Sequence, residues 1–384
     1  MELEFIDVVS ILYSFGAVIL IVFLLSLPSK RPLSNRLLAA FLFISLFDNS
    51  SRFIAVYVYS GSPVLGMILS ETVFLLAPLF YLFFKASIFV DFHLKKSTLL
   101  HLLPFVAILI LLVPGYFIPL ITDPEAEWVE LFYDTSLFRF IYIGIHLQHY
   151  IYYFFIVLML VKYRRIVLEN YSSQKLENYR WLLQLFVIYL ITESMATTKN
   201  IIRFNSAENI YLLAQNIVSV LALLIVFWLI IKALLKPALF SGVHDEIPSL
   251  KYMLKTTKAS SQEQLEDQNS KLIARLKEHM QEEEPYLDSN LSMYDLAKQL
   301  DVSARELSIS INHTLGKHFF DFINEYRVNK AMELIRNSSD EKLTILEVLY
   351  EVGFNSKSSF NTAFKKHTGI TPTEFKKNSS LRVA

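Results

Sequence analysis

The chain contains no cysteine, which excludes disulfides, thiolate metal sites and a cysteine nucleophile. Its 9 glycines form no glycine-rich phosphate loop, and neither a serine elbow nor a kinase phosphoacceptor pattern is present. An excess of charge of one sign is also missing, because 36 Lys and Arg balance 36 Asp and Glu. Bulk charge therefore indicates no partner, and nothing in the sequence supports an enzyme or a bound cofactor.

Apolar residues, in contrast, are abundant and unevenly spread. They make up 53% of the 384 residues, and the mean hydropathy is +0.40. Apolar runs dominate up to Leu235, whereas the sequence from Lys236 onward is mixed and charged. The composition predicts a membrane domain over 1–235, a linker over 236–286 and a soluble domain over 287–384.

The N-terminal part holds seven windows of about 20 apolar residues, which is the length of a helix that crosses a bilayer. They are Val8–Leu27, Leu37–Tyr59, Val64–Phe84, Leu99–Ile118, Phe138–Leu160, Trp181–Ile202 and Tyr211–Leu235. Prolines within two of them are tolerated better in a membrane helix than in a soluble one. We therefore expect a seven-helix transmembrane bundle.

The charges of the loops predict the orientation of this bundle. Alternate loops are basic, with Lys30, Arg31, Arg36, Lys85, Lys95, Lys96, Lys162, Arg164, Arg165, Lys175 and Arg180. The loop Pro119–Leu137 carries five acidic residues and no Lys or Arg, and only Lys199 and Arg203 depart from the pattern. The positive-inside rule then places the N-terminus outside and the C-terminus in the cytoplasm, as expected for a bacterial inner-membrane protein.

A charged amphipathic helix is predicted within the linker, over Gln262–Glu284. Leu265, Leu272 and Leu276 follow coiled-coil spacing with Asn269 between them, and one buried Asn can fix a two-stranded register. This pattern suggests a homodimer through the 262–284 helix. The alternative is a spacer helix whose apolar stripe packs on its own domain.

The soluble domain shows one helix-turn-helix pattern twice. Ser292 is a candidate cap for a first short helix, and Ser303 with Glu306 forms a capping box at the start of a second, Ala304–Thr314. The pattern recurs when Thr344–Val352 is followed by a turn at Gly353 and a helix to about His367, capped by Asn355 or Ser356.

A long amphipathic helix, Phe319–Arg336, lies between the two units, with Phe320, Ile323, Tyr326, Ala331, Leu334 and Ile335 to bury. Two units on one helix can place recognition helices in successive major grooves, roughly 34 Å apart.

The segment Val352-Gly-Phe-Asn-Ser-Lys-Ser-Ser-Phe360, followed by Phe364-Lys365-Lys366, Gly369-Ile-Thr-Pro372 and Phe375, resembles the signature of the AraC/XylS family of bacterial transcription regulators. Leu296-Ala297, Val302-Ser303, Leu307, Gly316, Phe319, Tyr326-Arg327 and Ala331 fit the first unit. The resemblance covers about Tyr286–Lys377. It implies double-stranded DNA as a partner, and the preceding spans resemble the membrane-anchored members of that family.

The resemblance also implies which side chains face DNA. These are Arg305, Ser308, Ile309 and Asn312 in the first unit, and Lys357, Ser358, Asn361 and Thr362 in the second. Arg and Asn can contact base edges in pairs of hydrogen bonds, and Lys365, Lys366, Lys376 and Lys377 suit phosphates. Asp301 replaces a frequent turn glycine, Leu349 a small alanine and Ile309 a frequent arginine.

Charge supports DNA binding unevenly. Residues 287–384 contain 13 Lys and Arg against 12 Asp and Glu, but from Lys357 onward six face a single acid, Glu374. The second unit is therefore expected to supply most of the salt-dependent affinity. The alternative is a helical domain that binds protein.

Ionisable and amide side chains inside the predicted spans are costly in hydrocarbon and mark candidate sites. We expect a signal pocket that opens outward, lined by Arg52, Glu71, His146, His149, Glu193, Gln215 and Asn216. The alternatives are structural pairs such as Arg52 with Glu71 or Glu193, and a metal site of His146, His149 and Glu193. The metal is disfavoured because no His-Glu-x-x-His pattern is present.

The expected fold class is all-α: a transmembrane bundle followed by a double helix-turn-helix domain. The expected function is a membrane-bound transcription regulator that couples a small-molecule signal, from outside or within the bilayer, to promoter binding. The alternatives are a passive anchor for a regulator, or a transporter-like membrane domain with a regulatory tail.

Overall fold

The computed structural model describes residues 4–29, 32–58, 61–89, 92–122, 136–171, 174–205, 208–241, 263–337 and 343–380. Regular structure in these ranges is helical, and none of them contains a strand, as the all-α expectation requires. The chain divides into two compact units. The first is Met1–Met159 with Leu182–Thr256, and the second is Leu160–Trp181 with Thr257–Ala384.

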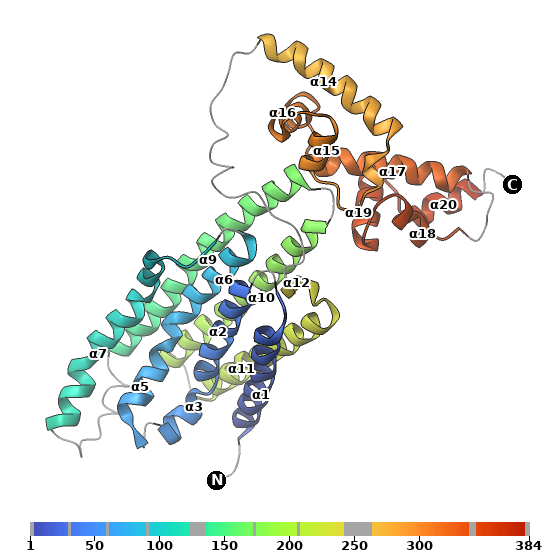
Figure 1. The fold of residues 1–384 in the computed structure, drawn as a ribbon. Coiled ribbons are helices and arrows are strands. Elements are labelled where there is room, and N and C mark those ends of the chain that lie inside the picture. Colours follow the sequence, from blue (N-terminus) through green and yellow to red (C-terminus); the bar gives the residue numbers. More distant parts are fainter. Residues whose placement is uncertain are drawn as a thin grey trace. The chain divides into compact units, whose positions relative to one another are not determined.

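Long helices that lie side by side build the first unit (Figure 1). Its elements are α1 Phe5–Ser26, α2 Pro32–Asn49, α3 Ser51–Phe53, η1 Ile54–Val58, α5 Pro63–Glu71, η2 Thr72–Leu75, α6 Leu76–Ile88, η3 Lys96–Leu102, α7 Leu103–Thr122, α11 Glu208–Leu235, α12 Ala238–Ser241, and most of α9 Ser136–Asn170 and α10 Gln174–Asn205. Helix α2 packs against α1 and α6, and α1 packs against α11.

Within the described ranges, four helices are long and apolar enough to cross a membrane: Phe5–Ser26, Val64–Ile88, Asn178–Phe204 and Glu208–Leu235. They correspond to the first, third, sixth and seventh predicted windows. The second window is interrupted, because α2 ends at Asn49 and the chain continues as the short α3 and the π-helix η1. The window Leu99–Ile118 begins as the 3-10 helix η3, and the fifth window lies within α9.

Some of the residues that predicted the orientation lie outside the described ranges. They include Lys30, Arg31 and the acidic residues between 123 and 135. The number of crossings and their direction therefore stay predictions.

An aromatic cluster fills the core of the first unit. Phe80 of α6 is buried, and its ring lies 5.2 Å from that of Phe41 and 4.7 Å from that of Tyr189, centroid to centroid. Gly16 lets α1 approach α11 closely, since a β-carbon there would lie 3.0 Å from a methyl of Val226. Ring packing and one small residue thus bring the helices together around the interior of this unit.

The second unit contains the double helix-turn-helix. Its elements are α14 Glu263–Glu282, η4 Pro285–Leu287, α15 Met293–Gln299, α16 Ala304–Ile309, η5 Ser310–Thr314, α17 Phe319–Asn337, α18 Ile345–Glu351, α19 Lys357–Thr368 and α20 Pro372–Ser380. The predicted boundaries of these helices are confirmed to within a few residues. One detail of the burial pattern is wrong, because α17 buries Phe319 and Phe322 while Phe320 is half-buried.

Two hydrophobic cores lie along α17, one for each helix-turn-helix. The first contains Leu296, Leu307 and Phe322, and the second contains Val348, Phe360 and Phe364. Leu276 and Met280 of α14 are buried in the first core. The linker helix therefore packs this stripe on its own domain, so Leu276 is not available for a coiled-coil contact with a second chain. The side chains of Leu265 and Asn269 lie outside the described residues.

Candidate functional site

Each recognition helix begins at a side-chain cap. Ser303 accepts a hydrogen bond from the backbone N–H of Glu306 (3.2 Å), and Glu306 accepts one from the N–H of Ser303 (3.0 Å). Ser356 caps α19 by accepting from the N–H of Ser359 at 3.2 Å, which decides between the two predicted caps. Hydrogen bonds from Ser303 lower the pKa of the Glu306 carboxyl. The start of each helix is therefore fixed by residues within one turn of it.

The turns before these helices need left-handed backbone. Asp301 has φ 54°, which is consistent with a short polar side chain in place of a turn glycine. Gly353 has φ 85°, and a β-carbon there would lie 2.6 Å from the carbonyl oxygen of Leu287. Glycine is thus required at the second turn both by conformation and by the close approach of the Tyr286–Leu287 backbone.

The predicted DNA-facing residues of the first helix-turn-helix lie on α16 and the π-helix η5 that continues it. Arg305 is exposed, whereas Ser308, Ile309 and Asn312 are half-buried. The Asn312 amide donates a hydrogen bond to the Ser308 hydroxyl at 3.0 Å. This helix therefore presents one extended cation beside a small polar pair and an apolar side chain, a set suited to a few base contacts.

The second recognition helix, α19, is more polar. Lys357, Ser358 and Thr362 are exposed, and Asn361 is half-buried. The Thr362 hydroxyl donates a hydrogen bond to the backbone carbonyl of Ser358 at 2.8 Å. The exposed side chains of Lys357 and Ser358 lie in the first turn of the helix. The positive end of the α19 backbone dipole lies in the same turn, which favours an approaching anion such as phosphate.

The lysines expected at phosphates differ in their surroundings. Lys365 is exposed. Lys366 forms an ion pair with Asp321 of α17 at 2.6 Å, although it remains largely accessible. Lys376 donates to the Leu343 carbonyl at 2.5 Å, so this lysine also ties α20 to the segment before α18.

A buried arginine that the sequence indicated only as a match to the family signature joins the two helix-turn-helix units. Arg327 of α17 is fully buried, and it donates to the carbonyls of Tyr286 (2.6 Å) and Asp288 (2.7 Å). Its guanidinium lies 5.5 Å from the ring centroid of Phe354 in the second turn. Burial lowers its pKa to about 9, which leaves it charged at neutral pH. Arg327 therefore fixes the segment after α14 against both helix-turn-helix units.

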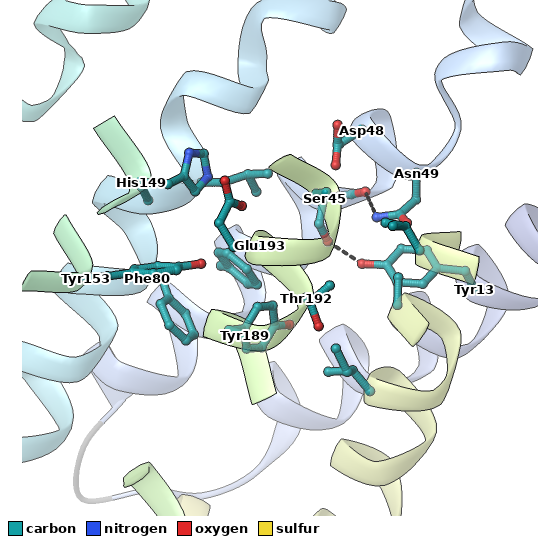
Figure 2. Close-up of a pocket in the computed structure, with 17 residues that line it drawn as sticks. Tyr13, Ser45, Asp48, Asn49, Phe80, His149, Tyr153, Tyr189, Thr192 and Glu193 are labelled. Carbon is teal, nitrogen blue, oxygen red and sulfur yellow. Dashed lines mark hydrogen bonds between the residues drawn. The ribbon is translucent and has the colours of Figure 1, made fainter. Parts of the chain in front are cut away.

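The first unit contains a partly open cavity of about 110 Å³ (Figure 2). Tyr13 and Tyr153 point toward each other across it, from α1 and α9. Ser45, Asp48 and Asn49 of α2, His149 of α9, and Tyr189, Thr192 and Glu193 of α10 add polar groups. The Tyr13 hydroxyl lies 2.6 Å from the Ser45 hydroxyl. Of the predicted pocket residues, the structure brings His149 and Glu193 to this cavity.

His146 lies in a hydrogen-bonded network with α10. Its Nδ1 is 2.6 Å from Oε1 of Glu193, and the Asn200 amide donates to its Nε2 at 2.9 Å. With Nε2 accepting, Nδ1 carries the proton and donates it to the Glu193 carboxylate. Thr197 lies 3.1 Å from the same Nδ1. The network therefore fixes the orientation of Glu193 at the cavity wall.

The remaining predicted pocket residues do not line this cavity. Arg52 pairs with Glu4 and Asp7 near the start of α1, so the expected pair with Glu71 or Glu193 is not formed. Glu71 is buried, and Gln215 and Asn216 are half-buried on α11, whose Val218 and Ala222 line the cavity instead. Within the part of the chain that the structure describes, no group of three His, Cys, Asp or Glu residues can hold a metal ion.

Residues 296–378 match a family described as a helix-turn-helix domain. The chain is 29% identical over 119 residues to the uncharacterized HTH-type transcriptional regulator YdeC of Bacillus subtilis. The aligned residues make up 30% of the chain and 40% of that protein. It is 29% identical over 96 residues to the arabinose operon regulatory protein of Escherichia coli, and this alignment covers 25% of the chain and 32% of that protein. The chain thus spans about 40% of the length of the curated relatives that it matches first.

A shorter relative is matched over most of its length. The probable transcription factor PqrA of Proteus vulgaris is 30% identical over 88 residues, which cover 22% of the chain and 71% of that protein. The family match over residues 296–378 begins within α15 and ends within α20, so it includes α17 and most of both helix-turn-helix units. By this match and the fold of its second unit, the chain belongs to the AraC-type family of helix-turn-helix transcription regulators.

Proposed function

We propose that the protein is a membrane-bound transcription regulator that binds DNA sequence-specifically through its second unit and responds to a signal through its first. The observation that carries the DNA-binding part is the pair of capped recognition helices, α16 and α19, held on one long helix, α17. Both present exposed polar residues.

The two recognition helices contribute unequally. The first offers Arg305 and the apolar Ile309, which suit one guanine edge and a thymine methyl group. The second offers Lys357, Ser358, Asn361 and Thr362 and carries Lys365 and Lys366 in its last turn. We infer that α16 adds base preference at a few positions, and that α19 supplies most of the salt-dependent affinity.

Membrane insertion of the first unit is supported by its surface. Ile11, Phe15 and Leu25 of α1 are exposed, as are Phe154 and Phe155 of α9 and Leu224, Phe227 and Ile231 of α11. Monomeric soluble proteins rarely expose continuous apolar faces along several neighbouring helices. Together with the four helices long enough to cross, these faces favour a bilayer. The seven crossings and the cytoplasmic C-terminus of the proposal rest on the apolar windows and the loop charges of the sequence.

Sensing is supported by the cavity. It is lined from α1, α2, α6, α9, α10 and α11, so a bound molecule contacts helices that otherwise meet only through side chains. A ligand shifts a regulator only when it binds two arrangements with different affinity, and an interhelical site is where such a difference arises.

Membrane fractionation and chromatin mapping of the full chain in a bacterial host test the proposal together. The expected result is protein in the membrane fraction and enrichment of defined promoters that disappears when Arg305 and Lys357 are both replaced by Ala. Uniform, sequence-independent enrichment, or soluble protein, would contradict it. If promoter output follows protein abundance in every cavity variant, the first unit is a passive anchor.

A further inference from the structure

The cavity of the first unit has the size of a small molecule rather than of a water pair. Its volume is about 110 Å³. A protein cavity of about 150 Å³ accepts benzene, which has six heavy atoms. A fully enclosed ligand here is therefore limited to about five heavy atoms.

The charges on the wall select the sign of that ligand. Asp48 and Glu193 both line the cavity. Glu193 is committed to His146, but Asp48, which is exposed, has no hydrogen bond or ion pair among the residues that the structure describes. The Lys199 amine interacts with both carboxylates electrostatically without forming an ion pair in the described part of the chain. The two carboxylates repel an anion, whereas a cation gives Asp48 the direct ionic contact that the more distant Lys199 does not form.

Aromatic rings form much of the remaining wall. Tyr13, Phe80, Tyr153 and Tyr189 come from four different helices, and their rings and the three tyrosine hydroxyls line the space (Figure 2). The faces of such rings attract organic cations, and ammonium groups are held by aromatic residues together with carboxylates. A divalent metal is a poorer fit, because the described residues supply no cluster of three metal-binding side chains.

The geometry points to a binding site for a small organic ammonium ion, with Asp48 as the ionic contact and Tyr13, Tyr153 and Tyr189 as the aromatic enclosure. This assignment rests on the proposed sensor role and specifies its ligand class. The His146–Glu193 pair holds the second carboxylate in place. A cation bound between α2 and α10 favours the arrangement in which both carboxylates face the cavity.

Calorimetric titration of the full chain in lipid nanodiscs tests the site. Tetramethylammonium chloride is the probe, tert-butanol is a neutral molecule with the same number of heavy atoms, and sodium chloride matches ionic strength. Tetramethylammonium is expected to bind saturably and tert-butanol is not. Asp48→Asn and Tyr189→Leu are each expected to weaken binding at least tenfold. Phe43→Leu, which changes an exposed residue of α2 outside the cavity lining, leaves binding unchanged.

Equal binding of tert-butanol, or undiminished binding by folded Asp48→Asn, would overturn the cation site. If Asp48→Asn fails to insert, Asp48→Glu retains the charge and is expected to keep saturable binding, and its loss in folded protein would also count against the site. Promoter output, measured with and without the probe, separates this inference from the sensor role. Binding without any change in output rejects sensing and leaves the site, whereas a response to other membrane conditions without probe binding rejects only the cation site.

Discussion

The two units satisfy their polar groups in opposite ways. In the second unit most caps are local: Ser292 with Asp295, Ser303 with Glu306, Thr344 with Glu347 and Thr371 with Glu374 are each three residues apart. In the first unit the key pairs are remote, since His146 meets Glu193 across 47 residues and Tyr13 meets Ser45 across 32. Caps between residues three positions apart can be predicted from the sequence. Pairs between distant residues form only when the helices pack, so a site built from them cannot be predicted in this way.

Arg327 is the exception within the second unit, and its removal is expected to have the largest effect. Arg327→Leu leaves the carbonyls of Tyr286 and Asp288 without their donor, and each buried unsatisfied group costs about 1–3 kcal/mol. We expect chemical unfolding of a 263–384 fragment to show a loss of roughly 3 kcal/mol.

Arg336 provides the matched control, because it is exposed and stacks over Phe375 at 5.2 Å. Arg336→Leu is expected to change the unfolding free energy by less than about 1 kcal/mol. Equal losses of unfolding free energy for the two substitutions would show that the remote contacts of Arg327 stabilise the domain no more than an exposed arginine does.

DNA contacts come next in size. Arg305→Ala and Lys357→Ala are each expected to weaken binding to a selected operator by about 1–3 kcal/mol. Arg305→Ala also relaxes preference at one base position, because a base-edge contact is lost. Lys365→Ala weakens all sequences alike and lowers the salt slope by about one. Fluorescence anisotropy at several salt concentrations separates these outcomes.

Lys271 of α14 is exposed and lies away from both recognition helices in sequence. Lys271→Ala removes the same charge as Lys357→Ala and is expected to leave affinity and salt slope unchanged. A loss as large as that of Lys357→Ala would show that net charge, rather than the α19 surface, carries the affinity.

The His146–Glu193 network of the first unit is expected to affect signalling more than folding. Glu193→Gln keeps the shape but removes the carboxylate that His146 holds and that faces the cavity. We expect a several-fold change in promoter output at unchanged membrane abundance. Glu71→Gln alters a buried carboxylate outside the cavity lining and is expected to leave output per molecule unchanged. Parallel immunoblots and reporter assays measure both quantities, and identical behaviour of the two variants would remove the cavity from the mechanism.

The smallest effect concerns the local caps. Hydrogen bonds from Ser303, Thr344 and Thr371 lower the pKa of Glu306, Glu347 and Glu374 below their ordinary value of 4.5. Their contribution to stability is therefore present above pH 4.5 and is lost as pH falls through the lowered values. Thermal unfolding of the 263–384 fragment should show a smaller acid-induced decrease in Tm for Glu306→Gln than for the wild type. An unchanged acid slope would show that this cap contributes no pH-dependent stability.

Sequence reasoning was most accurate where signals are short-range. The Ser303–Glu306 box, the turn at Gly353 and the start of α17 at Phe319 all depend on residues within a few positions, and all are confirmed. It was least accurate for contacts across the bundle. Arg52 of α3 pairs with Glu4 and Asp7 at the start of α1, and no periodicity in the sequence signals these partners.

The linker helix shows the same limit. Its leucine spacing fits both a coiled coil and an intramolecular stripe, because the two patterns differ by less than one residue over two turns. Burial of Ile273, Leu276 and Met280 shows that this part of the helix packs as a stripe on the second unit, and the dimer stays a prediction for the residues before it. A fragment that begins at Tyr286 would therefore expose the first core, whereas one that begins at 263 retains α14.

The sequence by itself determined the all-helical class, the apolar N-terminal part and the double helix-turn-helix, since periodicity, caps and turn residues act over one or two helical turns. Its AraC type followed from the resemblance of the motifs to that family. Only the tertiary structure decided that Arg327 joins the two DNA-binding units, that α14 completes the first core, and that Asp48, His149 and Glu193 share one cavity. These depend on which helix faces meet, and hydrophobic packing, which sets those faces, is not directional enough to be read from residue spacing.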